Sequence, residues 1–229
     1  MPSKSSSRAT ARALVTGAAR GIGRSVADTL ESKGIQVLRP GRQELDLAVP
    51  ESVADYLTNL DQTVDILVLN AGINNPEPME TLSADNWSTT QQVNLNANLL
   101  LLQGVLPGMA AEGFGRVVAL SSVYAHRARM GRVAYSASKA AIEEVVRAVA
   151  VEYGPFGVLA NCVAPGFVLT DLTYQNNDAK QLQALAERIP VGRLAEPEEI
   201  ATFICWLASD ENSYITGQCI TIDGGFLCV

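Results

Sequence analysis

Histidine, charge and long apolar runs are all scarce in this chain. There is one histidine in 229 residues, charged residues make up 18%, and no apolar run approaches the roughly 18 residues of a membrane span. The few charges are unequal, since 17 Lys and Arg stand against 24 Asp and Glu, a net charge of −7. We therefore expect a soluble protein without a membrane segment and without a nucleic-acid partner, because binding to phosphate backbones needs an excess of cations.

Paired metal-ligating residues are missing as well. The four cysteines have no CxxC spacing, and with a single histidine we expect no metal site and reduced, buried thiols. The basic, Ser-rich residues 1–12 lack the apolar core of a secretory signal, so we expect a flexible leader and a cytoplasmic protein. The cysteines are Cys162, Cys205, Cys219 and Cys228.

What the chain does contain is an alternation of short apolar runs with longer segments of helical period. The runs predict strands, and near-continuous apolar strands between helices are typical of a parallel sheet covered on both faces. We predict one α/β domain over 13–229, a Rossmann-type doubly wound sheet in three α/β/α layers. The predicted strands are 13–16, 35–38, 65–69, 116–120, 158–163 and 219–222. The predicted helices are 22–32, 51–60, 84–111 with one break, 135–153, 178–187 and 197–208.

The second crossover is shortened. Only six residues separate Leu38, at the end of the second strand, from Leu45, whereas a parallel crossover takes about a dozen or more. We expect the usual helix to be absent there and any third strand over 44–47 to be a short edge strand.

A glycine turn, "TGAARGIG", follows the first predicted strand and opens a helix. Gly17, Gly21 and Gly23 would let the backbone approach a pyrophosphate, whose charge meets the first amides of the helix. Such a turn can also be a plain strand-to-helix junction. Its place after the first strand of an alternating α/β chain favours dinucleotide binding.

The choice of dinucleotide is expected at the end of the second strand. The chain leaves that strand as "LRPGR", with Arg39 and Arg42 and no carboxylate before Glu44, and Arg20 lies in the glycine turn. Because one guanidinium group can donate two parallel hydrogen bonds to the oxygens of a phosphate, these residues favour NADP(H) over NAD(H). The alternative is that Arg39 or Arg42 is an ordinary surface charge.

An ordered set of motifs resembles the short-chain dehydrogenase/reductase family, and more narrowly 3-oxoacyl-ACP reductases. The resemblance covers nearly all of 10–226. Its elements are "TGAARGIG", "LNAG" (69–72), Asn94 in "VNL", "SS" (121–122), "YSASK" (135–139), "APGFVLTD" (164–171) and "ITGQCITIDGG" (215–225). The resemblance implies an oxidoreductase with a nicotinamide cofactor.

The family also implies roles for particular residues at the cofactor site. Beyond the glycines and arginines already named, the resemblance implies cofactor contacts by Ile22 at the glycine turn and by Asp46 and Leu47 at the adenine. It places Asn70, Ala71 and Gly72 beside the adenosine. It places Pro165, Gly166, Val168 and Thr170 around the nicotinamide. The family serine lies thirteen residues before the tyrosine, which selects Ser122 over Ser121. Asn94 would support a water relay behind the lysine.

The residues themselves agree with that chemistry. Tyr135 and Lys139 are four residues apart on a predicted helix, so an ammonium can stand near a phenol and lower its pKa. Tyr135 would exchange a proton with the substrate oxygen, Ser122 would hydrogen-bond that oxygen, and Lys139 would hold the nicotinamide ribose. We thus expect an enzyme that interconverts a carbonyl and a secondary alcohol.

The substrate is less determined. We expect the walls of the substrate site to come from 73–78, from the segment between Ser122 and Tyr135, and from the lid after Thr170. The lid is polar near its start, at Tyr174, Gln175, Asn176 and Asn177, which favours a small or polar metabolite. The basic loop between Ser122 and Tyr135 would bind an anionic substrate or be a solvated or interface loop. The candidate substrate residues are His126, Arg127, Arg129, Arg132 and Tyr174. A 3-oxoacyl-[acyl-carrier-protein] reductase is the alternative, although residues 109–116 lack the basic side chains that docking an acidic carrier needs. A non-catalytic NADP-binding sensor or scaffold is a third interpretation.

The long helices 84–111 and 135–153 are more apolar than one core-facing stripe requires. In the family the corresponding helices form dimer interfaces, so we expect a homodimer or homotetramer, the alternative being simple packing on the sheet. Trp87 and Trp206 are expected in the core or an interface.

Overall fold

The computed structural model describes residues 11–229, so the first ten residues of the expected leader lie outside the described residues. The described chain is built on a six-stranded parallel sheet in the order β2-β1-β3-β4-β5-β6. Its strands are β1 (Arg12–Val15), β2 (Gln36–Leu38), β3 (Ile66–Leu69), β4 (Gly115–Leu120), β5 (Val158–Pro165) and β6 (Cys219–Ile222). The predicted Rossmann-type parallel sheet is confirmed, with strand bounds within two residues of expectation.

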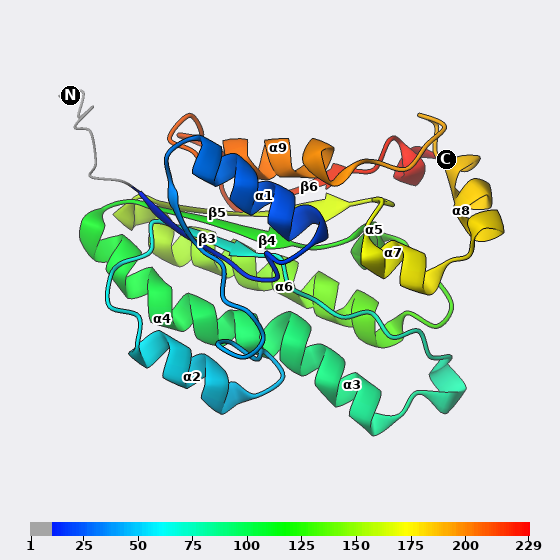
Figure 1. Ribbon diagram of the computed structural model, residues 1–229, viewed down its shortest axis with the longest axis horizontal. Helices are drawn as coiled ribbons and strands as arrows, with labels where there is room; N and C mark the ends of the chain where they lie inside the picture. The colour runs from blue at the N-terminus through cyan, green and yellow to red at the C-terminus, as the bar shows by residue number, and fades with distance from the viewer. Residues whose placement is uncertain (1–10) are drawn as a thin grey trace.

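Helices cover both faces of this sheet, which gives three layers (Figure 1). One face carries α1 (Gly21–Ser32) and α9 (Pro197–Leu207), and the other carries α4 (Ala97–Glu112) and α6 (Val133–Tyr153). Residues alternate between two apolar cores along each strand: Val15 and Val68 pack on the α1 side, and Leu14 and Leu67 on the α4 side. Because both faces are buried, the strands read as unbroken apolar runs. The remaining α-helices are α2 (Pro50–Thr58), α3 (Ala84–Gln91), α5 (Val123–His126), α7 (Asp171–Asn176) and α8 (Ala179–Ala186).

As expected, no helix lies between β2 and residues 44–47, and these residues form no strand, not even the short edge strand that the sequence allows. These residues form turns, Leu45 and Leu47 are buried in the α4-side core, and the chain passes directly into α2. The segment is too short to climb over the sheet and return beside β2. β2 therefore forms the edge of the sheet.

The predicted break in the helix over 84–111 is a π-helical turn, η2 (Gln92–Asn96), between α3 and α4. Such turns displace one residue from the regular ladder and are frequent at functional sites. Here the turn contains Asn94, which is fully buried. Within residues 11–229, no helix is long and apolar enough to cross a membrane.

Candidate active site

A cavity of about 660 Å³ lies at the carboxyl ends of β1, β3, β4 and β5. The chain leaves β1 for α1 on one face of the sheet and leaves β3 for α3 and α4 on the other. In open parallel sheets, ligands bind at such a reversal, outside the carboxyl ends of the strands. Every residue predicted to contact the cofactor lines this cavity except Gly23 and Arg39.

The glycine turn lines the cavity, and two of its glycines expose backbone atoms there. Gly17 and Gly21 have φ of 67° and 53°, where side chains are rarely tolerated. A Cβ on Gly23 would lie 2.4 Å from both the Gly17 carbonyl oxygen and Asn70 Nδ2. Asn70 Nδ2 donates to the Thr16 carbonyl at 2.9 Å, which ties the turn to the end of β3. The N-cap residue of α1, Arg20, makes no side-chain hydrogen bond to the first turn, so the turn fits the diphosphate of a dinucleotide.

The three candidate phosphate-binding arginines differ in availability. Arg42 lines the cavity with 81% of its side chain exposed and one contact to Asp46 at 3.1 Å. Arg20 also lines the cavity and pairs with Asp171 at 3.3 Å.

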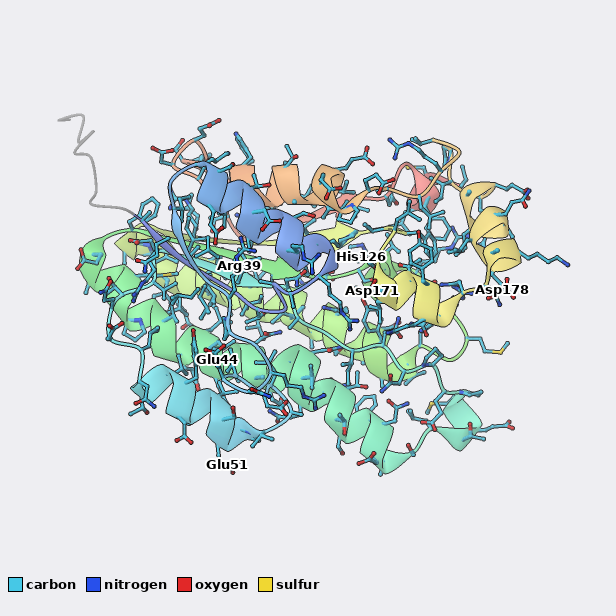
Figure 2. The ribbon with its side chains drawn as sticks, in the orientation of Figure 1. Arg39, Glu44, Glu51, His126, Asp171 and Asp178 are labelled. Atoms are coloured by element: carbon cyan, nitrogen blue, oxygen red, sulfur yellow. The ribbon has the colours of Figure 1, made fainter. Side chains whose placement is uncertain are left out.

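Arg39 is placed differently. Its guanidinium binds Asp28 at 2.7 Å and Glu31 at 2.8 Å, both on α1, and it does not line the cavity. Figure 2 shows Arg39 well apart from Asp171. The expected contact of Arg39 with the cofactor is therefore not favoured, because two carboxylates already neutralise it.

The serine, tyrosine and lysine all line this cavity and lie close to one another. Ser122 follows β4, and its Oγ accepts from the Tyr124 amide at 3.2 Å, which leaves its own proton to donate. Tyr135 and Lys139 lie in the first two turns of α6, with Lys139 Nζ 5.7 Å from the centre of the Tyr135 ring. Lys139 Nζ donates to the Leu120 carbonyl at 2.5 Å, so two of its N–H groups stay available.

Asn94 supports the site from behind and does not line the cavity. Its Oδ1 accepts from the Ile73 amide at 2.8 Å, and its Nδ2 donates to the Ile73 carbonyl and to Ser138 Oγ. These bonds fasten the loop after β3 to α6 beside Lys139. A Cβ on Gly72 would lie 3.5 Å from Lys139 Nζ and 3.2 Å from Asn94 Oδ1, so glycine leaves this corner open.

Burial controls the electrostatics of this pair. It lowers the pKa of Lys139 from 10.5 to about 8, because the ammonium loses its hydration. Burial also raises the pKa of Tyr135, and a hydrogen bond with Ser122 and the charge of Arg132 oppose that rise. The expectation that the Lys139 ammonium lowers the pKa of Tyr135 is wrong, because burial raises that pKa by more than Ser122 and Arg132 lower it.

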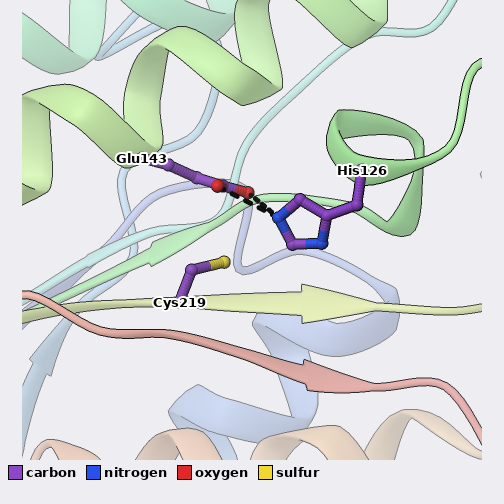
Figure 3. Close-up of side chains that lie close together, drawn as sticks. All are labelled: His126, Glu143 and Cys219. Carbon is purple, nitrogen blue, oxygen red and sulfur yellow. Dashed lines mark hydrogen bonds and ion pairs between the residues drawn. The ribbon is translucent and has the colours of Figure 1, made fainter. Parts of the chain in front are cut away.

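Ser121, which lines the cavity, and His126, which does not, both bind the Glu143 carboxylate. Ser121 Oγ donates to Glu143 at 2.5 Å, which supports Ser122 as the reactive serine. His126 binds the same carboxylate at 3.0 Å, as Figure 3 shows, and does not line the cavity. Cys219 Sγ, a His126 ring nitrogen and a Glu143 carboxylate oxygen lie within 4.8 Å of one another. The Glu143 carboxylate is already bound by Ser121 and His126.

The basic loop divides into two pairs. Arg129 and Arg132 line the cavity. Arg127 binds the carbonyls of Phe226 and Val229 instead, and like His126 it lies outside the cavity. Tyr174 is also outside, with 55% of its surface exposed, so the proposed contacts of these three residues with substrate are not favoured.

Several further cavity residues come from the three segments expected to form the substrate walls. Tyr124 and Asn74 line it beside Tyr135, and Asn176 and Asn177 line it from α7 and the loop that follows. Their signal is weak, since Tyr124 lies in a four-residue helix and Asn74 in a loop. The sequence therefore indicated the segments that hold Tyr124 and Asn74, but not these two side chains individually.

The fold and the cavity together define an oxidoreductase of the dinucleotide-binding Rossmann type. A family model described as Enoyl-(Acyl carrier protein) reductase matches residues 43–227. The chain belongs to the short-chain dehydrogenase/reductase family.

Similar proteins act on different substrates. The chain is 34% identical to 3-oxoacyl-[acyl-carrier-protein] reductase FabG of Vibrio cholerae, over 95% of this chain and 97% of that one. A Beutenbergia cavernae structure with bound NADP, assigned as an NAD(P)-dependent gluconate 5-dehydrogenase, has a TM-score of 0.89 at 33% identity, covering 97% and 98% of the two chains. Gluconate 5-dehydrogenase of Burkholderia cenocepacia, in complex with NADP and tartrate, has a TM-score of 0.87 at 27% identity, with 96% of both chains covered.

Proposed function

We propose that this protein is an NADP(H)-dependent oxidoreductase that interconverts a carbonyl and a secondary alcohol on a small or polar metabolite. The observation that carries the proposal is one cavity in which Ser122, Tyr135 and Lys139 lie at one end and the glycine turn at the other. A bound nicotinamide dinucleotide would supply hydride exchange with the substrate carbon.

The side chains supply the proton and the positioning. Because burial raises the pKa of Tyr135, its hydroxyl stays protonated at neutral pH and donates to the carbonyl oxygen during reduction. Ser122 donates a second hydrogen bond to that oxygen and so holds it against the tyrosine. Lys139, fixed by the Leu120 carbonyl, would bind the ribose hydroxyls with its free N–H groups. Asn94 keeps the loop after β3 against α6.

The preference for NADP(H) is supported by Arg42 and Arg20 at the adenosine end of the cavity. Both are on the surface with single carboxylate partners, so a 2′-phosphate can compete for their guanidinium groups. Two solved relatives hold NADP, which is consistent with this assignment.

The alternative substrate is a 3-oxoacyl group on acyl carrier protein, supported by relatives of that name with 33–35% identity. An acidic carrier needs a basic docking surface, and residues 109–116 offer only Arg116. That guanidinium binds the Ser209 and Asn212 carbonyls and is 6% exposed. A small metabolite is therefore favoured.

We further propose a single catalytic domain over 13–229, in a cytoplasmic homodimer or homotetramer. The family precedent supports association through α4 and α6. Exposed Leu99 on α4 and Val151 on α6 are consistent with an interface there. A non-catalytic sensor is disfavoured because Ser122, Tyr135 and Lys139 are all in place.

The test is oxidation of NADPH by the purified protein with a panel of neutral ketones, keto sugars, oxo acids and acetoacetyl thioesters, with NADH in parallel. The proposal predicts turnover of a small polar carbonyl with NADPH preferred. Turnover restricted to acyl thioesters would establish the alternative, and no turnover with any carbonyl would favour the sensor.

A further inference from the structure

Two arginines at the reaction end of the cavity have no acidic partner among residues 11–229. Arg129 Nη1 donates to the Tyr124 hydroxyl at 2.5 Å, and Arg132 Nη1 donates to Asn74 Oδ1 at 2.6 Å. Both guanidinium groups also lie 5.9 Å from the centre of the Tyr124 ring. All of these partners are neutral, whereas Arg12, Arg20, Arg39, Arg42, Arg147 and Arg193 each pair with a carboxylate.

Holding these two charges together has a cost. Arg132 is only 6% exposed, so its charge has lost most of its hydration without gaining a counter-ion. Burial lowers the pKa of Arg132, Tyr124 and Tyr135 oppose this shift, and the positive charge of Arg129 adds to it. An anion between the two guanidinium groups would relieve both effects, since arginine forks bind carboxylate and phosphate oxygens through two parallel hydrogen bonds.

The pair is fixed close to the reacting groups. Arg132 directly precedes α6, three residues before Tyr135, and the rings of Tyr124 and Tyr135 meet edge to face with centroids 6.5 Å apart. The charge of Arg132 is felt at the Tyr135 hydroxyl. One small molecule could therefore place an anionic group between Arg129 and Arg132 and its carbonyl group at Tyr135.

The opposite wall of the cavity is attached to this loop. The Glu77 amide donates to the Gly131 carbonyl at 2.9 Å, which joins the segment after β3 to the basic loop. Asn74, on that segment, orients the Arg132 fork. The two arginines thus line the cavity from a loop that is held by hydrogen bonds to the segment after β3.

We propose that Arg129 and Arg132 form an anion-binding subsite for a carboxylate or phosphate of the substrate. The preferred substrates are then oxo acids and hydroxy acids, or phosphorylated ketones, in place of neutral ketones. This inference rests on the proposed oxidoreductase function for the reaction and adds the substrate class. It leaves out Arg127 and His126, whose partners lie elsewhere.

The test compares matched charged and neutral substrates. Oxo acids from 3-oxobutanoate to 6-oxoheptanoate are each paired with the methyl ester, and dihydroxyacetone phosphate is paired with dihydroxyacetone, all with NADPH. For the best acid, Arg132→Gln should lower kcat/KM by roughly 30-fold or more, mainly through KM, because a desolvated charge pair is lost. Arg129→Gln should lower it by roughly fivefold or more, because the Arg129 side chain is more exposed. The same variants should change kcat/KM for the neutral partner by less than about threefold. Arg127→Gln, outside the cavity, is the matched control and should affect neither.

The outcomes separate the possibilities. Preference for the phosphate over every oxo acid assigns the subsite to phosphorylated ketones, and the reverse assigns it to carboxylates. Equal losses on charged and neutral partners, or no preference for charge in the unchanged protein, would overturn the subsite. If neither partner of any pair and no other carbonyl of the panel is turned over, the oxidoreductase proposal has failed. Calorimetric titration of 4-oxopentanoate into the protein, with Arg132→Gln alongside, then tests the subsite alone: binding lost in the variant supports it, and binding retained or absent in both rejects it.

Discussion

The buried lysine of the active site should make the protein's stability depend on pH in a defined way. In the folded protein the pKa of Lys139 is about 8, against an ordinary 10.5. Since the unfolded chain holds the proton more tightly, the folded state is penalised wherever the lysine is charged. That penalty is fully present below about pH 8 and disappears as the pH rises toward about 10.5.

The size follows from the shift. About 1.4 kcal/mol per pKa unit gives a penalty of about 3 kcal/mol at pH 7, which falls to about 1 kcal/mol at pH 10. We predict that Lys139→Met, compared with the unchanged protein, loses about 2 kcal/mol of relative stability between pH 7 and pH 10. This difference is insensitive to the pH-independent loss of the bond to the Leu120 carbonyl.

The assay is urea unfolding of both proteins without added nucleotide, at several pH values from 7 to 10. Lys180→Met, on the exposed surface of α8, is the matched control and should show no such trend. A stability difference for Lys139→Met that stays constant across this range would refute the argument that burial depresses the pKa of this lysine.

Three further outcomes are expected. Gly23→Ala places a Cβ 2.4 Å from Gly17 O and Asn70 Nδ2, so NADPH affinity measured by fluorescence titration should fall about tenfold or more. Gly154→Ala, with open space around its Cβ, should leave the NADPH affinity unchanged. Equal NADPH affinities of the two variants would contradict the role of the glycine turn in binding the cofactor. Arg42→Ala should raise the Kd for NADPH about tenfold and leave the Kd for NADH unchanged. Arg39→Ala should change neither Kd, since Arg39 is neutralised by Asp28 and Glu31. Equal effects of the two variants would argue against selection of NADPH by Arg42. Ser122→Ala removes a hydrogen bond that lowers the pKa of Tyr135, so the pH above which kcat/KM for reduction declines should move upward, and a downward shift would be inconsistent with that contact.

Most of the fold could be predicted because its causes are local. Strands buried on both faces must be apolar throughout, and the intervening helices have their own period. The segment 44–47 was the exception, since Leu45 and Leu47 are spaced like strand residues. They are buried against the helices on the α4 face of the sheet, and the pattern alone does not distinguish that burial from burial within a strand.

The site was predictable only in part because spacing does not reveal partners. Ser122, Tyr135 and Lys139 were found from their motif, and the structure places them together. Arg39 stands at the end of β2, where a residue that selects NADP(H) is expected. Its partners Asp28 and Glu31 come within reach of its guanidinium only when α1 packs beside β2. In the same way His126 is directed to Glu143, which is seventeen residues further along the chain.

The central claim is that Tyr135 exchanges the proton in a reaction driven by the nicotinamide cofactor. The most direct measurement is turnover and NADPH binding of Tyr135→Phe, which keeps the ring and removes only the hydroxyl. The account predicts that kcat falls by roughly 100-fold or more while the Kd for NADPH stays within about threefold of the unchanged protein. Turnover retained with the phenylalanine in place would contradict it.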